Sequence, residues 1–455
     1  MIITIDDKNK YDLLQQQISG TDCIVIPIFI NDTYHPGINK LAALVLHSPV
    51  DDNDYIIGVN HPDILYKSNY KQLLDSCSKI FIYKKIDFLY FYDNESKLYD
   101  IDLMHWFETG KVLQEQPSII KIFYSRKYPK LTKLNCIIPI YKLVEGCNYI
   151  ITKSLELIQS NIYQTAPYTA YNHDIILGLY SIEKNGFRSS KSEMQKYFPD
   201  SNLTVHFKDD IVYTQYNPYT TTGRPTCRYN SINFTAMNKE NGCRNIITSR
   251  FDGGKLIEFD YESYHLRIIA DIIQYVLPED ISVHEYLGRQ YFGVPELTPE
   301  QYAQSKTVSF RQLYGGVEPE FKSIDFFNKV DEFVNSMWIH WCTKGYIETA
   351  IYKHKLLKSN YSDMNKSKLF NYFIQATETE YSIKKILVLQ EYLKDKQTKV
   401  ILYTYDAILL DVPIEEKNNL IEIQSLLSGN GFPTAIKIGK TYHNMKKVKF
   451  NHIYT

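Results

Sequence analysis

Cysteine, glycine and proline are scarce in this sequence, with 7, 19 and 17 residues of 455. The cysteines are scattered and odd in number, and they form no Cys-x-x-Cys pair and no cluster with histidine. This pattern argues against a zinc site or a disulfide framework and favours a reducing compartment. Low-complexity tracts and internal repeats are absent as well, so a repeat architecture is excluded.

Long apolar runs and an excess of one charge are also lacking. The apolar run 23–30 is much shorter than the roughly 20 residues that a membrane-spanning helix needs, and the first residues do not resemble a secretory signal. We therefore expect a soluble, cytoplasmic protein with no membrane partner. The formal net charge is −1, so contacts with nucleic acid would depend on local basic patches and not on a global field.

The chain is long enough for two or three domains, and its 44% hydrophobic content can fill their cores. In the first part, apolar runs alternate with polar turns, and residues 71–76 have helical spacing, which predicts an α/β unit. The predicted strands are residues 23–30, 41–47, 55–59, 79–83 and 88–92.

The middle of the chain has a different character. A helix is predicted at 150–160, and the Tyr/Pro/Thr-rich stretch 163–171 that follows is a candidate linker. Residues 174–183 have helical periodicity again and stop at Asn185-Gly186, a combination typical of a helix end. Strand-like alternation resumes near residue 208.

Two apolar strands further along each lead to a lone aspartate. The strand 255–260 ends at Asp260, and the apolar runs 400–404 and 407–412 flank Asp406, which predicts a hairpin with this aspartate at its tip. Carboxylates at the ends of adjacent strands could hold two divalent cations roughly 3.5–4 Å apart, the arrangement used for phosphoryl transfer. Alternatively, each is an ordinary aspartate in a turn.

Between the aspartates lies a helix with a basic and aromatic face. Thr298 opens it with a capping-box pattern, and Gly315-Gly316 ends it. Lys306, Phe310 and Tyr314 are spaced i, i+4 and i+8, so they share one face. The ammonium group of Lys306 could bind a triphosphate. The ring of Phe310 could lie against a sugar, and the phenol of Tyr314 could stack near a base pair. The alternative is an ordinary amphipathic helix with a lysine that reaches solvent.

In this order, the segments resemble the three polymerase motifs of family A DNA polymerases, the group of bacterial DNA polymerase I and many phage enzymes. Residues 260–267 read Asp-Tyr-Glu-Ser-Tyr-His-Leu-Arg, where the family has Asp-Tyr-Ser-x-x-Glu-Leu-Arg. Residues 306–315 resemble its fingers helix, and residues 405–407 stand where it has His-Asp-Glu. Further resemblances are Thr222-Gly223-Arg224 with Asn233, residues 345–349, and the pair Asn371 and Gln375.

The resemblance implies a DNA-templated DNA polymerase that extends a primer 3′-OH by two-metal phosphoryl transfer, in phage replication and without proofreading. Asp260 and Asp406 would be catalytic and would hold two Mg²⁺ ions, with the Tyr261 carbonyl as a third ligand and Mn²⁺ as a substitute. The partners would be primer-template DNA and dNTPs.

The resemblance also implies contacts with nucleotide and DNA. Lys306 would neutralise triphosphate charge, Phe310 would lie against the deoxyribose, and Tyr314 would guard the templating base. In this family a phenylalanine at the second place goes with discrimination against dideoxynucleotides. The residues implied in DNA binding are Arg224, Asn233, Asn371, Gln375 and Tyr405.

Three single residues depart from the family pattern. His265 stands where the family has the glutamate that blocks the ribose 2′-OH. The imidazole would still contact the nucleotide, but the exclusion of ribonucleotides is in question. Tyr302 stands in place of an arginine that helps to bind triphosphate, which suggests a lower affinity. Ala407 replaces an acidic neighbour of the last aspartate, a change that we expect to be tolerated.

A fourth departure is a missing segment. Between Gly186 and Asp209, where the family inserts a long helical thumb, residues 188–198 can supply at most a short helix. Because the thumb wraps duplex DNA, we expect weak processivity unless a partner protein clamps the template.

Residues 1–165 stand where the family carries a 3′–5′ exonuclease. Residues 79–87, which end in Asp87, resemble an exonuclease motif with its asparagine replaced. The first strand lacks the Asp-x-Glu pair, and no aspartate occurs between Asp102 and Asp174, so the carboxylates for two metal ions are missing. We expect an exonuclease-like fold without proofreading, with Asp87 in a solvated or capping role.

The predicted fold is therefore a multidomain α/β and α+β protein. Residues 1–165 would form a degenerate, ribonuclease H-like exonuclease domain and residues 166–207 a linker with a vestigial thumb. Residues 208–455 would form a polymerase palm and fingers, with the fingers at about 275–345. Two other functions remain open, a catalytically degenerate DNA-binding or replication accessory protein and a ribonucleotide-tolerant polymerase.

Overall fold

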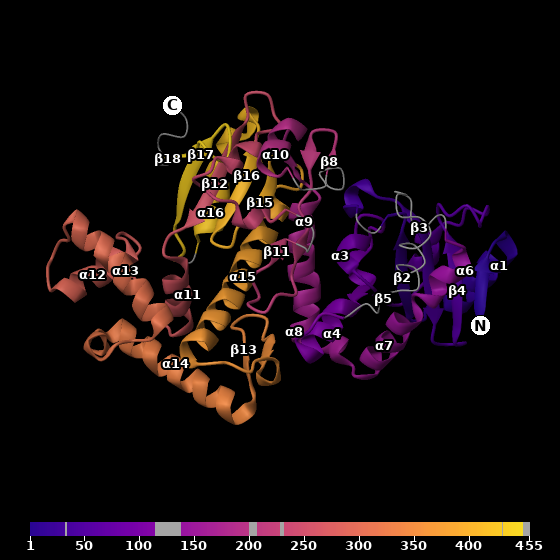
Figure 1. Ribbon diagram of the computed structural model, residues 1–455, viewed down its shortest axis with the longest axis horizontal. Helices are drawn as coiled ribbons and strands as arrows, with labels where there is room; N and C mark the ends of the chain where they lie inside the picture. Colours follow the sequence, from indigo (N-terminus) through magenta and orange to yellow (C-terminus); the bar gives the residue numbers. More distant parts are fainter. Residues whose placement is uncertain (32–33, 114–137, 200–206, 228–231, 430, 449–455) are drawn as a thin grey trace. The chain divides into compact units, whose positions relative to one another are not determined.

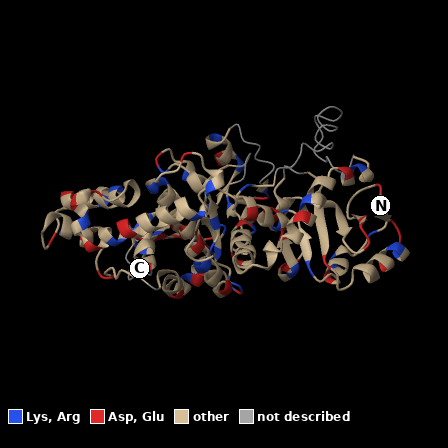
Figure 2. Ribbon diagram, turned by 90° about the horizontal axis from the view of Figure 1, so that it is seen from below, with Lys and Arg blue, Asp and Glu red and all other residues tan. Residues whose placement is uncertain are grey.

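The computed structural model describes residues 1–31, 34–113, 138–199, 207–227, 232–429 and 431–448. The chain divides into two compact units (Figure 1). The first comprises Met1–Tyr180 with Asn202–Asp209, and the second comprises Ser181–Ser201 with Asp210–Thr455. Basic and acidic residues are interspersed along the ribbon of both units (Figure 2), in agreement with the near-zero net charge. Among the described residues, every helix is too short or too polar to cross a membrane.

The first unit is built on a six-stranded mixed sheet in the order β1-β4-β3-β2-β5-β6. Its strand β2 pairs antiparallel with β3 and parallel with β5. All residues of β2 and β3 are buried, as is typical of inner strands that are covered on both faces. The strands are β1 (Ile2–Ile5), β2 (Cys23–Phe29), β3 (Leu41–Ser48), β4 (Asn53–Gly58), β5 (Ile80–Ile82) and β6 (Leu98–Asp100).

Helices connect these strands, and they confirm the predictions at 71–76 and 150–160. The strand predicted at 88–92 is wrong, because α3 (Lys85–Phe88) ends there and a turn follows. Phe88 and Tyr92 are four residues apart and their rings stack at 5.9 Å, so their spacing was helical rather than alternating. The other helices are α1 (Lys8–Ile18), α2 (Tyr70–Asp75), α4 (Ile101–Thr109), α6 (Ile140–Glu145) and α7 (Asn148–Gln159).

The predicted linker at 163–171 is also wrong. These residues are largely helical and belong to the first unit, which continues to Tyr180 and so beyond the predicted boundary at 165. Thr165 caps α8 (Ala166–Ala170), and Pro167 occupies its first turn, so the residues that suggested a linker begin a helix. Tyr168 is buried and donates its hydroxyl to the Asp100 carbonyl at 3.0 Å. After a π-helical turn, α9 (Ile176–Glu183) ends before Asn185-Gly186, as predicted.

Asp87 is buried in the first turn of α3, so a solvated position is wrong, and the capping role that was the alternative stays a prediction.

The second unit is built on a five-stranded antiparallel sheet in the order β15-β16-β12-β17-β18 (Figure 1). The predicted strand 255–260 and the predicted hairpin at 400–412 are confirmed. Helix α16 (Leu420–Ser428) packs against β12 and β17. The strands are β12 (Lys255–Tyr261), β15 (Lys399–Tyr403), β16 (Ala407–Val412), β17 (Thr434–Gly439) and β18 (Lys446–Val448).

Helix α15 (Lys366–Tyr392) is the longest described helix of this unit, with 27 residues, and it contacts four other helices. The capping box predicted at the start of α13 (Pro299–Gly315) is confirmed, because the side chains of Thr298 and Gln301 each accept the backbone N–H of the other. The helices that α15 contacts are α11 (Tyr264–Ile272), α13 (Pro299–Gly315), α14 (Asp325–Lys344) and α16. Helix α12 (Val283–Phe292) packs on α13.

Short elements complete the second unit. The helix α10 (Lys191–Tyr197) agrees with the prediction of at most a short helix at 188–198. Three further strand pairings among the described residues belong to this unit, and one of them lies where strand-like alternation was predicted to resume, near residue 208. They are β10 (Tyr216–Asn217) with β11 (Thr226–Cys227), β7 (Phe187–Arg188) with β9 (Ile211–Val212), and β13 (Tyr346–Glu348) with β14 (Lys355–Leu357).

Glu380 ties α15 to the loop after β13. Its carboxylate is buried, and its Oε2 accepts the backbone N–H groups of Ile351 at 2.9 Å and Tyr352 at 3.2 Å. Burial raises the pKa of the Glu380 carboxyl to about 7, even though these hydrogen bonds act in the opposite direction. The charged form therefore costs stability in the folded state.

Because the folded pKa of Glu380 lies above the ordinary value of 4.5, the folded protein binds more protons than the unfolded chain in this window. The protonated Glu380 carboxyl therefore adds to the free energy of unfolding below about pH 4.5, and this contribution is lost as the pH rises towards 7. Glu380→Gln should remove this loss, which is worth roughly 3 kcal/mol at most. Thermal unfolding at a series of pH values between 4.5 and 8 measures the effect.

The control for this experiment is Glu391→Gln, which neutralises an exposed carboxylate on the same helix. We expect the unfolding temperature of Glu380→Gln to fall less with pH than that of the wild type and of the control. Parallel curves for all three proteins would contradict the assigned role of Glu380.

Candidate active site

The pairing of β12 with β16 brings the two aspartates together. In this antiparallel register Asp260 lies opposite Ala407, and the Tyr261 N–H donates to the Asp406 carbonyl at 2.8 Å. Tyr405 has a φ of +70°, which makes the tight turn between the hairpin strands. Asp406 is thus held at the hairpin tip beside the end of β12, as the sequence predicted.

The electrostatic environment of Asp406 is unusual. Although part of its side chain is open to solvent, the surrounding protein raises the pKa of its carboxyl to about 6, with further contributions from the negative charges of Asp260 and Glu378. Like charges in one place favour a bound cation. The arrangement therefore fits a cation-binding site.

The donor set suits Mg²⁺ more than a transition metal. Within the described residues, no group of three or more His, Cys, Asp and Glu side chains is arranged to hold a metal ion. Asp260 and Asp406 supply hard carboxylate oxygens, and Mg²⁺ usually keeps water and substrate phosphate as its other ligands. Tyr261 has its ring stacked on Tyr264 at 4.3 Å and its hydroxyl on the Leu427 carbonyl at 3.3 Å, which anchors the backbone that would offer the third ligand.

A lysine that sequence reasoning missed lies at the same strand. Lys437 on β17 is opposite Glu258 in the register, and its Nζ contacts Glu258 at 2.6 Å and Asp260 at 2.5 Å. Because Lys437 and Asp260 are far apart in the sequence, only the strand pairing reveals this contact. The ammonium is a built-in countercharge for one of the two candidate metal ligands.

Lys437→Gln should strengthen divalent cation binding, because it removes a positive charge next to Asp260 while keeping a polar side chain. A change of about tenfold in affinity is expected, equivalent to about 1.4 kcal/mol. Mn²⁺ titration of the nucleotide-free protein, followed by electron paramagnetic resonance, measures it. Lys447→Gln is the matched control, since Lys447, on the strand β18 next to β17, contacts the exposed Glu262 at 3.3 Å and neither Glu258 nor Asp260. Equal affinities for both variants would contradict this role of Lys437.

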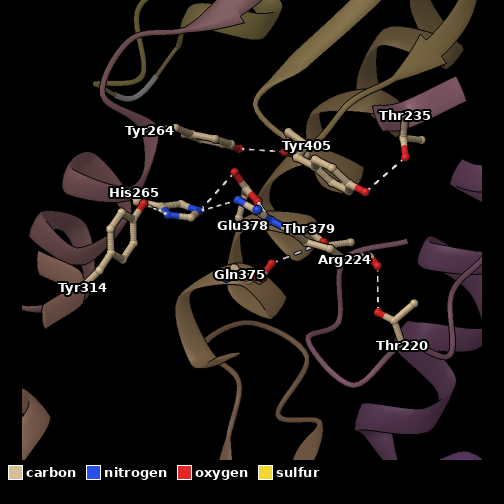
Figure 3. Close-up of polar contacts among 11 residues, drawn as sticks. Thr220, Arg224, Thr235, Tyr264, His265, Tyr314, Gln375, Glu378, Thr379 and Tyr405 are labelled. Atoms are coloured by element: carbon tan, nitrogen blue, oxygen red, sulfur yellow. Dashed lines mark hydrogen bonds and ion pairs between the residues drawn. The ribbon is translucent and has the colours of Figure 1, made fainter. Parts of the chain in front are cut away.

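A second cluster lies beside the aspartates and centres on Glu378 of α15 (Figure 3). Its carboxylate accepts Arg224 Nε–H at 2.6 Å and lies 3.1 Å from His265 Nε2. Burial acts to raise the pKa of Glu378, but the charges of His265 and Arg224 lower it below its ordinary value. Glu378 is therefore ionised, and sequence reasoning gave no signal of it because a buried glutamate in a long helix has no motif.

His265 connects this cluster to α13. Its Nδ1 lies 2.5 Å from the Tyr314 hydroxyl, and the Phe310 ring stacks on Tyr314 with centroids 5.8 Å apart and an interplanar angle of 6° (Figure 3 shows His265 and Tyr314). Burial raises the pKa of Tyr314 to about 12, so its phenol keeps its proton. His284 of α12 packs edge-on against Phe310 at 5.1 Å. Two of the three predicted face residues of α13, Phe310 and Tyr314, thus lie beside the Glu378 cluster.

Lys306 lies further along the same face of α13 and is exposed. Its Nζ lies 4.7 Å from the ring centroid of Tyr302, one turn earlier, and the Tyr302 hydroxyl lies 3.2 Å from Ser282 Oγ. Arg311 contacts the exposed Glu318 at 2.6 Å. Because Arg311 forms this ion pair with Glu318, it does not take over the role of the arginine that the family has at position 302.

Gly223 brings the Thr222-Gly-Arg segment against α15. Its φ is +70°, and a Cβ at this position would lie 2.6 Å from the Cβ of Ala376. A side chain is therefore excluded both by conformation and by space. The close approach places Arg224 over the ring of Tyr405, 4.8 Å from its centroid.

Hydrogen bonds continue from Tyr405 to the other predicted DNA contacts. The Tyr405 hydroxyl lies 3.1 Å from Thr235 Oγ1 (Figure 3). The Thr235 hydroxyl donates to Asn233 Oδ1 at 2.6 Å. Asn371 Nδ2 donates to the Tyr314 carbonyl at 3.4 Å. Gln375 lies one turn after Asn371 on α15, where its carbonyl accepts the Thr379 hydroxyl at 3.4 Å.

No family model matches the chain. Its sequence is similar to DNA polymerase I of Caldicellulosiruptor bescii, with 26% identity over 204 residues, 38% of this chain and 24% of that protein. It is also similar to DNA polymerase I of Borreliella burgdorferi, with 22% identity over 258 residues, 49% of this chain and 28% of that protein. The matched stretches thus span about a quarter of the length of these relatives.

Among solved structures, the chain resembles the POL domain of Pol1 from M. smegmatis, determined in complex with a DNA primer-template and dNTP. The TM-score is 0.72 at 12% sequence identity, and the likeness covers 97% of this chain and 99% of that one. The chain therefore has the mixed α/β multidomain fold of a DNA polymerase I polymerase domain.

Proposed function

We propose that this chain is a DNA-templated DNA polymerase that adds dNTPs to a primer 3′-OH. The observation that carries the proposal is the position of Asp260 on β12 next to the hairpin tip that carries Asp406, with Asp406 having a raised pKa next to other negative charges. The fold likeness and the two similar DNA polymerase I sequences support the same class of reaction.

In this proposal Asp260 and Asp406, with the Tyr261 carbonyl, hold two Mg²⁺ ions, and Mn²⁺ is a substitute. Bound there, the ions would activate the primer hydroxyl and neutralise the leaving pyrophosphate. The new bond joins the primer 3′ oxygen to the α-phosphorus, and the bond from that phosphorus to the pyrophosphate oxygen breaks. The chain's own part is to position these groups, because phosphoryl transfer needs little other covalent help.

The remaining roles follow from position. Lys306 presents an exposed ammonium for the triphosphate, and Phe310 and Tyr314 present stacked rings for the sugar and the base pair. His265 lies beside them and is the fourth nucleotide contact. The side chains proposed to bind primer and template are Arg224, Asn233, Asn371, Gln375 and Tyr405.

The finer parts of the proposal concern the context of the reaction. The short α10 in place of a long thumb supports a processivity partner that clamps the template. For the first unit we propose an exonuclease-like domain without proofreading, since its strand β2 carries no acidic residue and Asp87 is buried. A role in phage replication completes this proposal, on the resemblance of the motifs.

A second candidate function is a polymerase-shaped DNA-binding accessory protein without catalysis. The observation that favours it is the direct contact of Lys437 with Asp260, which weakens that carboxylate as a metal ligand. The replacement residues Tyr302 and Ala407 point the same way. The two candidates differ in whether Asp406 is needed for extension.

Primer extension decides between them. A labelled, recessed primer on a DNA template is incubated with Mg²⁺ and all four dNTPs, and Asp406→Asn serves as the inactive comparison. We expect templated extension by the wild type and a loss of at least about a hundredfold in the variant, because a metal ligand is removed. Duplex binding by both proteins without extension by either would favour the accessory protein.

The proposed contact of Phe310 with the sugar has its own test. Phe310→Tyr adds a hydroxyl that can take the place of the missing 3′-OH of a dideoxynucleotide, so discrimination against terminators should fall by about tenfold or more. The ratio of dideoxy to deoxy incorporation measures this. Phe292→Tyr, on α12, is the control. Unchanged terminator incorporation in Phe310→Tyr would remove the ring from the sugar site.

A further inference from the structure

Glu378 is a buried carboxylate that none of the roles above explains. It is 1% exposed and lies in the middle of α15. A buried charge is destabilising unless charged or hydrogen-bonding groups surround it. Its partners therefore indicate why it is there.

These partners come from two segments that are distant in the sequence (Figure 3). Arg224, on the loop before β11, donates through Nε to one carboxylate oxygen at 2.6 Å. His265, on α11, places Nε2 3.1 Å from the other oxygen, and Arg224 reaches the same imidazole nitrogen at 3.2 Å. One carboxylate thus determines the positions of two side chains that are proposed to meet the nucleotide and the primer-template.

The opposite edge of the imidazole is also held. His265 Nδ1 lies 2.5 Å from the Tyr314 hydroxyl, so the ring is bound at one nitrogen by the palm and at the other by α13. Tyr314 stacks on Phe310, the ring proposed to lie against the sugar. His265 is therefore next to the place where the sugar would bind, and its orientation is fixed from both sides.

We propose that Glu378 is a positioning residue that holds His265 as a barrier to the 2′-OH, so that this polymerase selects deoxyribonucleotides over ribonucleotides. The inference rests on the proposed polymerase function. In this arrangement Glu378 on α15 supplies the negative charge, and His265 on α11 supplies the imidazole that faces the sugar. Without this charge, Nε2 keeps only Arg224, which itself depends on Glu378 for its position, so the ring can turn aside for a ribose.

The ratio of kcat/KM for a dNTP to that for the matching rNTP tests the proposal. Glu378→Gln keeps the size of the side chain and removes its charge, and it should lower this ratio by about tenfold, a typical coupling between neighbouring residues. Glu380→Gln is the matched control, a buried carboxylate on the same helix whose partners lie in residues 349–352 and not at His265, and its ratio should equal that of the wild type. An unchanged ratio in Glu378→Gln would overturn the proposal.

A double-mutant cycle shows whether Glu378 acts through the imidazole. His265→Ala alone should lower the ratio, and adding Glu378→Gln should lower it no further, because the group that Glu378 positions is already missing. Independent, additive losses would overturn the proposal. If circular dichroism shows that Glu378→Gln is unfolded, Glu378→Asp replaces it, since the shorter side chain keeps the charge but withdraws it from His265.

The outcomes also separate this inference from the proposed function. A wild-type protein that extends no primer with dNTPs refutes the polymerase itself. A wild-type protein that extends with dNTPs, together with a Glu378→Gln ratio equal to the wild-type ratio, refutes only the role of Glu378.

Discussion

The antiparallel pairing of β12 with β16 and β17 is the constraint on which the candidate site depends. Its register places Asp260 beside the hairpin tip that carries Asp406, and it places Lys437 opposite Glu258. Because side chains alternate between the two faces of a sheet, a shift of one residue would turn each of these groups away from the others. Every residue of β16 is buried, so such a shift would require both faces of this strand to pack against new neighbours.

The three acidic groups near this sheet edge differ in how their charge is balanced. Asp260 has Lys437 as a neighbour, and Glu378 has Arg224 and His265. Asp406 instead has a pKa raised to about 6, chiefly by the loss of hydration next to the surrounding protein and further by its negative neighbours. A balanced carboxylate can position other side chains, whereas an unbalanced one favours a bound cation. This difference underlies the separate roles proposed for Glu378 and Asp406.

Local signals predicted the fold well where several of them agreed. Thr298, Pro299 and Gln301 mark the start of α13, and the capping box between them forms as expected. Prediction failed where the same residue types occur in two kinds of local structure. Thr165 and Pro167 suggested a linker, but the same residue types begin helices, and the burial of Tyr168 shows that this stretch packs in the first unit. Phe88 and Tyr92 likewise served a helical turn.

The sequence by itself determined which chemistry was available, because the aspartates at strand ends and the helical spacing of Lys306, Phe310 and Tyr314 are local properties of the chain. Only the tertiary structure decided which charges meet. Glu378 and Lys437 have no motif, since a buried glutamate in a helix and a lysine in a strand occur in many unrelated contexts. Their roles depend on contacts with residues more than a hundred positions away, and packing of β12, β17, α11 and α15 creates those contacts.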